Sequence, residues 1–204
     1  SQDVTLDTSA AALNIALITD TGAADGITSS GAYGVTGQEV GAKLLYSSDG
    51  GSTWLGSQPA LREGVNAIQV KQLDVAGNES AVATLNATLD TQAPPVPTVN
   101  ALITNATTPT LTGLANLDAG DGFAVTVNGV TYKLGVDNAL VHADGQWQLT
   151  LPSALNDGVY PVDVRITDLA GNESTDKTVA ELLVDTTPPA FSISLPAVGD
   201  AHAL

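Results

Sequence analysis

The sequence contains no cysteine and no methionine. The absence of cysteine excludes disulfides, zinc–thiolate sites and thiol chemistry, so rigidity outside a cell would need another source. Because methionine is absent even at position 1, we expect an internal fragment of a longer protein. No apolar run approaches the roughly 18 residues of a membrane-spanning helix, and no signal peptide is visible.

Basic residues are also scarce. Only 6 Lys and Arg oppose 22 Asp and Glu, which gives a formal net charge of -16 at pH 7. Nucleic acids and anionic membrane surfaces are therefore poor partners, whereas multivalent cations are good ones. The acids comprise 17 Asp and 5 Glu. Asp favours turns and its short carboxylate suits hard cations, although a solvated acidic surface explains any single Asp equally well.

Aromatic residues and catalytic motifs are few. Aromatics make up 4% of the chain, and the two histidines are His142 and His202. The chain has no Gly-x-Ser-x-Gly, phosphate-binding loop or His-Glu-x-x-His motif. Carboxylate pairs can hydrolyse glycosides, but these acids fall in turns rather than beside aromatic walls. We therefore expect no enzymatic activity.

What the sequence does contain is a repeat of domain size. Asp74–Ser80 reads Asp-Val-Ala-Gly-Asn-Glu-Ser, and Asp168–Ser174 repeats it 94 residues later with Leu in place of Val. A second signature recurs at spacings of 83 and 95 residues, as Leu6-Asp7-Thr8, Leu89-Asp90-Thr91 and Val184-Asp185-Thr186. Repeats of this length indicate small tandem domains. We place module 1 at 1–90, module 2 at 91–187, and the start of a following module or a disordered tail at 188–204.

Apolar and polar residues alternate within each unit, and turn signals recur about every 8–12 residues, which is typical of an antiparallel sandwich. These signals include Asp49-Gly50-Gly51, Asn128-Gly129, Asp144-Gly145 and Asp157-Gly158. No stretch sustains helical spacing. The predicted fold class is all-β, with two tandem immunoglobulin-like antiparallel β-sandwich domains joined by a short linker. Pro94 and Pro95 should keep that linker stiff and extended.

The alternation also predicts individual strands. In module 1 they lie near 13–19, 33–37, 42–48, 53–55, 65–73 and 81–89. In module 2 they lie near 97–103, 109–113, 123–128, 130–134, 146–151, 158–167 and 177–184. Trp54 and Trp147 fall inside these strands, where core or hairpin packing is the favoured interpretation over a ligand platform.

Several motifs together resemble the tandem bacterial Ig-like repeats of large surface adhesins. They are the repeated Asp-x-Ala-Gly-Asn-Glu-Ser string, Ser48–Trp54, Pro109–Gly113, Asp144–Trp147 and Val184–Pro189. The resemblance covers nearly the whole chain and is to type I-secreted, RTX-type proteins, including biofilm and ice-binding adhesins. It implies an extender role and dependence on Ca²⁺. The glycine-rich nonapeptide repeats of such secretion signals are missing here, and the loop at 20–32 is unusual.

Topology predicts where the acids meet. In an Ig-like sandwich the loop after the first strand lies at the C-terminal pole, whereas the B–C and F–G loops lie at the N-terminal pole. The residues predicted to gather at the joint between the modules are Asp20, Asp25, Asp90, Asp118, Asp121, Asp168 and Asn172. Six carboxylates in one place repel one another, and Ca²⁺ resolves this by taking about six to eight oxygens. We therefore predict one or two Ca²⁺ ions at this joint.

The same reasoning predicts further Ca²⁺ ligands at the other poles. At the N-terminal pole of module 1 they are Asp7, Glu39, Asp74 and Asn78. Asp185 would begin a third site that a following module completes.

Simpler interpretations of these acids stay open. Asp74 and Asp168 could cap their own turns, and Asp20 and Asp25 could belong to an ordinary loop. The spacing from Asp20 to Asp25 is not that of an EF-hand, because Gly22 and Ala24 occupy positions where ligands are expected.

The predicted function is mechanical: a Ca²⁺-stiffened extender on the bacterial cell surface, secreted, with neighbouring Ig-like modules of the same chain as partners. We expect no contact with nucleic acid or membrane. The alternative is an adhesive module that binds a glycan, a peptide or ice. Thr108, Thr110 and Thr112 alternate as on an ice-binding face, but one strand with three threonines is far short of a regular array.

Overall fold

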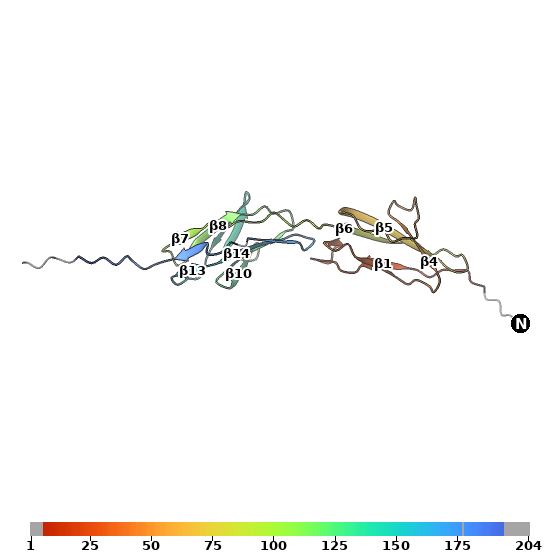
Figure 1. Ribbon diagram of the computed structural model, residues 1–204, viewed down its shortest axis with the longest axis horizontal. Helices are drawn as coiled ribbons and strands as arrows, with labels where there is room; N and C mark the ends of the chain where they lie inside the picture. The colour runs from red at the N-terminus through yellow and green to blue at the C-terminus, as the bar shows by residue number, and fades with distance from the viewer. Residues whose placement is uncertain (1–5, 177, 194–204) are drawn as a thin grey trace, which may run out of the picture.

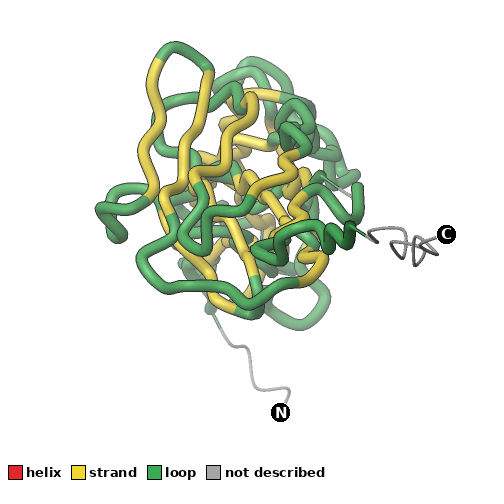
Figure 2. Tube along the Cα trace, turned by 90° about the vertical axis from the view of Figure 1, so that its left-hand side faces the viewer, coloured by secondary structure: helices red, strands yellow, loops and turns green. Residues whose placement is uncertain are grey.

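The computed structural model describes residues 6–176 and 178–193. Over this part the chain forms strands and no helix, which confirms the all-β class, and no helix there is long and apolar enough to cross a membrane. Figure 1 shows two groups of strands placed end to end along the long axis. Figure 2 looks along that axis, where strands and loops alone make up the cross-section.

Module 1 contains two sheets. Its strands are β1 (Asn14–Leu17), β2 (Ile27–Thr28), β3 (Tyr33–Thr36), β4 (Lys43–Ser47), β5 (Gly64–Leu73) and β6 (Ala83–Leu89). One sheet pairs β1 with β3, and the other has the order β2-β6-β5-β4. Alternate residues of β5, such as Ile68 and Val70, are buried between the sheets, as a period of two requires. The core that these residues form gives module 1 its own hydrophobic centre.

Module 2 has more and shorter strands. They are β7 (Leu102–Thr104), β8 (Thr110–Leu114), β9 (Gly122–Val127), β10 (Val130–Lys133), β11 (Leu140–Ala143), β12 (Gln146–Thr150), β13 (Gly158–Tyr160), β14 (Val162–Thr167), β15 (Glu173–Thr175) and β16 (Leu182–Val184). Their sheets have the orders β10-β9-β14-β15, β11-β12-β8 and β13-β16-β7. Trp147 is 1% exposed at the centre of the core, and its indole N–H donates to the Thr98 carbonyl at 2.9 Å.

The tryptophans confirm the packing that the sequence predicts. Trp147 lies in the module 2 core. Trp54 is half-buried beside its hairpin, with Lys71 Nζ 4.6 Å from its ring centroid. His142 is also structural, because its Nε2 lies 2.8 Å from the Ala115 carbonyl. His202 lies outside the described residues.

The first strand of each module is divided between two sheets, which the sequence did not predict. In module 1, β1 pairs with β3, whereas β2 pairs in parallel with β6. In module 2, Thr98 N–H bonds to the Leu114 carbonyl, and β7 then pairs in parallel with β16. The segment 20–32 is therefore not one loop. Its first part is an excursion between two halves of a strand, and β2 lies within it.

This excursion distinguishes the modules. In module 1 residues 18–26 separate β1 from β2, and we call them the arm. In module 2 only Ala101 separates the segment that pairs with β8 from β7. The arm is thus an insertion in module 1 at a position where module 2 has a single connecting residue.

Other strand predictions need correction. The segment 53–55 is not a strand and contributes only a bridge between Leu55 and Tyr46. The predicted strand 158–167 is broken at Pro161, which has no N–H to donate to a neighbour. The pattern missed β2, β11 and β15. Of the predicted strand 177–184, only 182–184 is regular, and residue 177 lies outside the described residues.

One extra residue explains the irregular end of module 2. The repeated turns are 94 residues apart, but the Asp-Thr signatures that follow them are 95 apart. The extra residue falls between Ser174 and Asp185, an interval that includes Ala180 with a φ of 67°. Beyond this module, residues 188–193 form no strand, and 194–204 lie outside the described residues.

Candidate functional site at the joint between the modules

The Asp168–Asn172 turn at the N-terminal pole of module 2, which we call the module 2 turn, is held by its own side chains. Asp168 Oδ1 accepts from the Asn172 backbone N–H at 2.8 Å, and Asp168 Oδ2 accepts from Asn172 Nδ2 at 2.9 Å. The Asn172 amide also donates to the Asp90 carbonyl at 2.9 Å. The repeated Asp and Asn therefore close the turn and tie it to the linker.

The module 1 turn, Asp74–Asn78, has the same construction. Asp74 Oδ1 and Oδ2 accept from the backbone and side-chain N–H groups of Asn78 at 2.7 and 2.8 Å. These hydrogen bonds, the Asn78 side chain first, hold the pKa of Asp74 below its usual range. In both modules, the carboxylate of this Asp therefore caps its own turn, as the simpler interpretation of the sequence has it.

The three Asp-Thr signatures share one local structure. Each Asp accepts, through Oδ1, the backbone N–H two residues further on: Asp7 from Ser9 at 3.2 Å, Asp90 from Gln92 at 2.9 Å and Asp185 from Thr187 at 2.9 Å. Such Asx turns redirect the chain as it leaves a sandwich. At Asp90 and Asp185 the signature marks the point where the chain leaves a sandwich, and at Asp7 it lies on the segment that enters module 1.

The arm is fixed at its base. Gly26 N–H donates to Asp20 Oδ2 at 2.9 Å, which closes the arm on itself. The hydroxyl of Thr28, a fully buried residue, donates to the Thr19 carbonyl at 3.1 Å. The arm therefore extends from the C-terminal pole of module 1 on an anchored base.

The tip of the arm contacts the module 2 turn directly. The Thr21 hydroxyl donates to the Ala170 carbonyl at 2.5 Å, and Ala170 is 0% exposed. A Cβ on Gly22 would lie 2.3 Å from the Leu169 carbonyl oxygen, so only glycine fits there. In Figure 1 these two segments approach each other between the sandwiches. The arm, the linker and the module 2 turn therefore meet at one joint, as the topology predicts.

The predicted joint acids do not form one cluster. Asp118 and Asp121 lie in the loop between β8 and β9, where Asp121 Oδ2 accepts the Asp118 N–H at 2.9 Å. Asp25 is exposed and accepts the Ile27 N–H at 2.9 Å. Over the described residues, no group of three or more His, Cys, Asp or Glu side chains is arranged to hold a metal ion. The expectation of six gathered carboxylates is therefore not met.

One carboxylate oxygen at the joint nevertheless has no hydrogen-bond partner in the described part of the chain. Asp20 Oδ1 is buried, while Oδ2 of the same group is bonded to Gly26. Burying a charged oxygen without a partner is unfavourable. The residues next to Asp20 in the arm carry further oxygens, the Thr19 carbonyl and the Thr21 hydroxyl, and Ca²⁺ prefers oxygen ligands.

At the free pole of module 1 the predicted residues are close to the linker but are used locally. Glu39 Oε1 accepts the Ala11 N–H at 2.5 Å, and Asn78 Nδ2 donates to the Asp7 carbonyl at 3.2 Å. The carboxylates of Asp7 and Asp74 are bonded within their own turns. These residues fix the entry of the chain into module 1.

The sequence reasoning missed two acids that hold the linkers. Glu63 accepts the Thr91 N–H at 2.9 Å and its hydroxyl at 3.1 Å. Asp157 likewise accepts the Thr186 N–H at 2.9 Å and its hydroxyl at 2.6 Å. Bonds from the Thr186 hydroxyl, then from its N–H and from Thr187, lower the pKa of Asp157. A signal was present, because Glu63-Gly64 and Asp157-Gly158 recur at the repeat offset.

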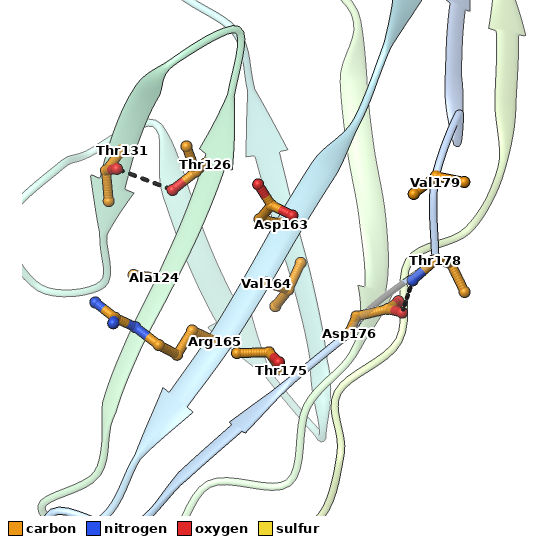
Figure 3. Close-up of a pocket in the computed structure, with 10 residues that line it drawn as sticks. All are labelled: Ala124, Thr126, Thr131, Asp163, Val164, Arg165, Thr175, Asp176, Thr178 and Val179. Atoms are coloured by element: carbon orange, nitrogen blue, oxygen red, sulfur yellow. Dashed lines mark hydrogen bonds between the residues drawn. The ribbon is translucent and has the colours of Figure 1, made fainter.

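Module 2 also carries a groove on the outer face of its four-stranded sheet, with a volume of about 510 Å³. It runs across β14, from Thr126 and Thr131 on one side to Asp176 and Thr178 on the other (Figure 3). Its polar lining includes Asp163, Arg165 and the hydrogen-bonded pair Thr126 and Thr131. No aromatic side chain lines it, so it lacks the stacking surface on which sugar rings commonly pack.

Comparison with known proteins gives one family match. Residues 99–186 match the model of a bacterial Ig-like domain. No curated protein sequence matches the chain.

Solved structures show only distant similarity. Fibronectin(III)-like modules of Clostridium thermocellum CbhA are 11% identical, with 89% of this chain and 100% of that chain covered and a TM-score of 0.45. A chimeric titin Z1Z2-Z1Z2 tandem is 16% identical over 75% and 88% of the two chains, with a TM-score of 0.34. The Bacteroides ovatus protein SGBP-B, solved with a mixed-linkage heptasaccharide, is 15% identical over 84% and 47%, with a TM-score of 0.28. The chain is thus a tandem of Ig-like β-sandwiches, of which the second matches the bacterial Ig-like domain family.

Proposed function

We propose that this chain is a non-catalytic spacer segment of a secreted, RTX-type bacterial surface adhesin, such as a biofilm or ice-binding adhesin. The observation that carries the proposal is the direct contact between the arm of module 1 and the module 2 turn. Two domains on a short linker move relative to each other by default. The Thr21–Ala170 bond and the close approach of Gly22 restrict that motion, so the pair can hold an attached domain away from a surface.

Ca²⁺ at the joint is the finer part of the proposal. Its support is Asp20 Oδ1, which is buried and has no hydrogen-bond partner among the described residues. Asp20 would hold the ion, with oxygens of Asp90 and of the module 2 turn. Asp25, Asp118 and Asp121, which bond within their own loops, would contribute negative charge rather than ligands. A bound Ca²⁺ would supply positive charge shared by both modules, and binding to the folded state alone would stabilise both. Asp7, Glu39, Asp74 and Asn78 at the free pole, and Asp185, are proposed as weaker counterparts.

Small-angle scattering and thermal unfolding, with Ca²⁺ and with a chelator, test both parts. With Ca²⁺ we expect an extended, narrow distribution of distances and a higher unfolding temperature. Asp20→Asn should remove most of the Ca²⁺-dependent shift, because it removes the negative charge of the carboxylate whose Oδ1 is buried. Asp163→Asn removes an exposed acid far from the joint and serves as the control.

The outcomes separate the two parts. If the distribution of distances is equally narrow with chelator, the spacer function is supported and the role of Ca²⁺ is rejected. If the distribution is broad both with Ca²⁺ and with chelator, the spacer function is rejected as well.

A direct adhesive role is the second candidate, and the groove of module 2 is the observation that favours it. Asp163 and Arg165 offer charge of both signs, which suits a peptide better than a glycan. Ice binding has less support, because Thr110 and Thr112 already bond to Thr150 and Asn100. Binding to glycan and peptide arrays tests this role, and Arg165→Ala should abolish any binding in the groove.

A further inference from the structure

The two N-terminal poles are built alike beyond their turns. Under each turn lies a glycine with positive φ, Gly41 at 83° and Gly120 at 100°. A Cβ on Gly41 would lie 3.0 Å from Val75 Cγ2, and one on Gly120 would lie 2.8 Å from Leu169 Cδ2. Both turns also donate an Asn side-chain N–H to a linker carbonyl. The same surface is therefore presented twice.

Among residues 6–176 and 178–193, only one of these surfaces is covered. In module 2, Ala170 is fully buried and Leu169 is 40% exposed, because the arm lies on them. In module 1, the equivalent Ala76 is exposed and Val75 is 81% exposed. A Cβ on Gly77 would meet no atom of the described residues within 4 Å, whereas one on Gly171 would lie 2.9 Å from Gly22 N.

The uncovered surface has a defined chemistry. The Ala76 carbonyl accepts no hydrogen bond from the described residues. The equivalent Ala170 carbonyl accepts one from the Thr21 hydroxyl. Val75 is the equivalent of Leu169, whose carbonyl oxygen Gly22 approaches closely. The Val75 carbonyl should therefore also be approached closely only by a glycine. Val75 and the fully exposed Val40 add an aliphatic rim. A hydroxyl followed by a glycine fits this surface.

We infer that the module 1 turn, with Val40, is a docking surface for the arm of another Ig-like sandwich that carries a hydroxyl–glycine tip like Thr21-Gly22. The inference rests on the proposed spacer function, because an array supplies such a neighbour. The inference also restricts which kind of module can precede module 1. Module 2 has only Ala101 where module 1 has the arm, so a module of the second kind cannot fill this surface.

Two fusions to the full chain test this restriction. In the first fusion, a copy of residues 7–89 replaces residues 1–6. Leu89 of the copy is then joined directly to Asp7. The copy carries Val75→Ile, which distinguishes its peptides by mass. In the second, a copy of residues 90–184 takes the same place and offers no arm.

Hydrogen exchange of the module 1 turn is the readout. In the first fusion we expect its amides to exchange at least about tenfold more slowly than in the chain alone, whereas the armless fusion leaves them unchanged. Ala76→Glu in the receiving turn should return exchange to the rate of the chain alone, and because Ala76 is exposed the module should stay folded.

Equal protection in both fusions, or no protection in the first, would overturn the inference. The module 2 turn in the same molecule separates this failure from failure of the spacer. If that turn stays protected while the module 1 turn does not, the spacer function stands and the docking surface falls.

Discussion

Gly22 of module 1 and Gly171 of module 2 lie back to back across the joint, so close that a Cβ on Gly171 would stand 2.9 Å from the Gly22 nitrogen. Their φ values of 74° and 82° are in the left-handed region that glycine tolerates best. The two residues are 149 positions apart in the chain. Because neither residue has a side chain, the backbones of the two modules can come into direct contact there.

Gly22→Ala should loosen the joint without unfolding either module. The new Cβ would meet the Leu169 carbonyl at 2.3 Å, so the arm must withdraw. Scattering should show a broader distribution of distances between modules. Gly50→Ala is the matched control, because Gly50 has a similar φ of 73° but open space around its Cβ. If both variants broaden the distribution equally, the contact does not set the joint.

Thr21→Val should weaken the joint by about 1–3 kcal/mol, the usual cost of leaving a buried acceptor without its donor. The Ala170 carbonyl would lose its donor while staying buried. Exchange of the module 2 turn should accelerate accordingly. Thr21→Ser keeps the hydroxyl and should restore most of the protection. Full protection in the Val variant would show that the bond is dispensable.

Gly113→Ala should destabilise module 2 alone. An added Cβ would lie 1.9 Å from the Thr98 carbonyl and 2.5 Å from Trp147 Nε1, so it would break the bond between them. Overpacking of this kind costs about 1–3 kcal/mol or more. Urea unfolding followed by tryptophan fluorescence measures the loss. Gly56→Ala in module 1, where the Cβ has open space, should be nearly neutral.

Asp157 should make the attachment of the second linker sensitive to acid. Its pKa is lower in the folded chain than in the unfolded chain, so its contribution to stability is present above the model-peptide value of 3.8. That contribution is lost as the pH falls through the lowered folded pKa. An NMR titration of the Thr186 amide should report release over this range. Asp157→Asn should flatten the titration, and an unchanged curve would assign the effect elsewhere.

Asp49 should titrate well below an ordinary Asp, with a pKa of about 2. The Thr53 hydroxyl is the largest cause, at 2.6 Å from Asp49 Oδ2. Because the pKa is lowered, the contribution of the carboxylate to hairpin stability is lost between about pH 3.8 and about 2. Thr53→Val should move the pKa toward 3.8, as measured by the carboxyl carbon shift. Thr53→Ser should leave it low.

Several parts of the fold were predictable because they depend on local pattern. Alternation placed β5 and β9 within a few residues, since each buries one face of a sheet. The repeated Asp and Asn marked the turns because their side chains close them. The strand break at Pro161 was also open to prediction, because proline cannot donate a hydrogen bond to a neighbouring strand.

The site was only partly predictable. Topology correctly brought the arm, the linker and the module 2 turn together. It could not say which acids would be used within their own loops, as Asp118 and Asp121 are. It also passed over Thr21 and Gly22, because a hydroxyl and a glycine in a loop have no distinctive pattern until a partner 149 residues away is placed beside them.

By itself, the sequence determined the all-β class, the number of repeated units and the acidic turns at their ends, because these follow from side-chain periodicity and local hydrogen bonding. Only the tertiary structure decided that the first strand divides between two sheets and that the arm reaches the neighbouring module. The reason is that parallel pairing of β2 with β6 and contact between Gly22 and Gly171 depend on distances between remote segments, which no local pattern encodes.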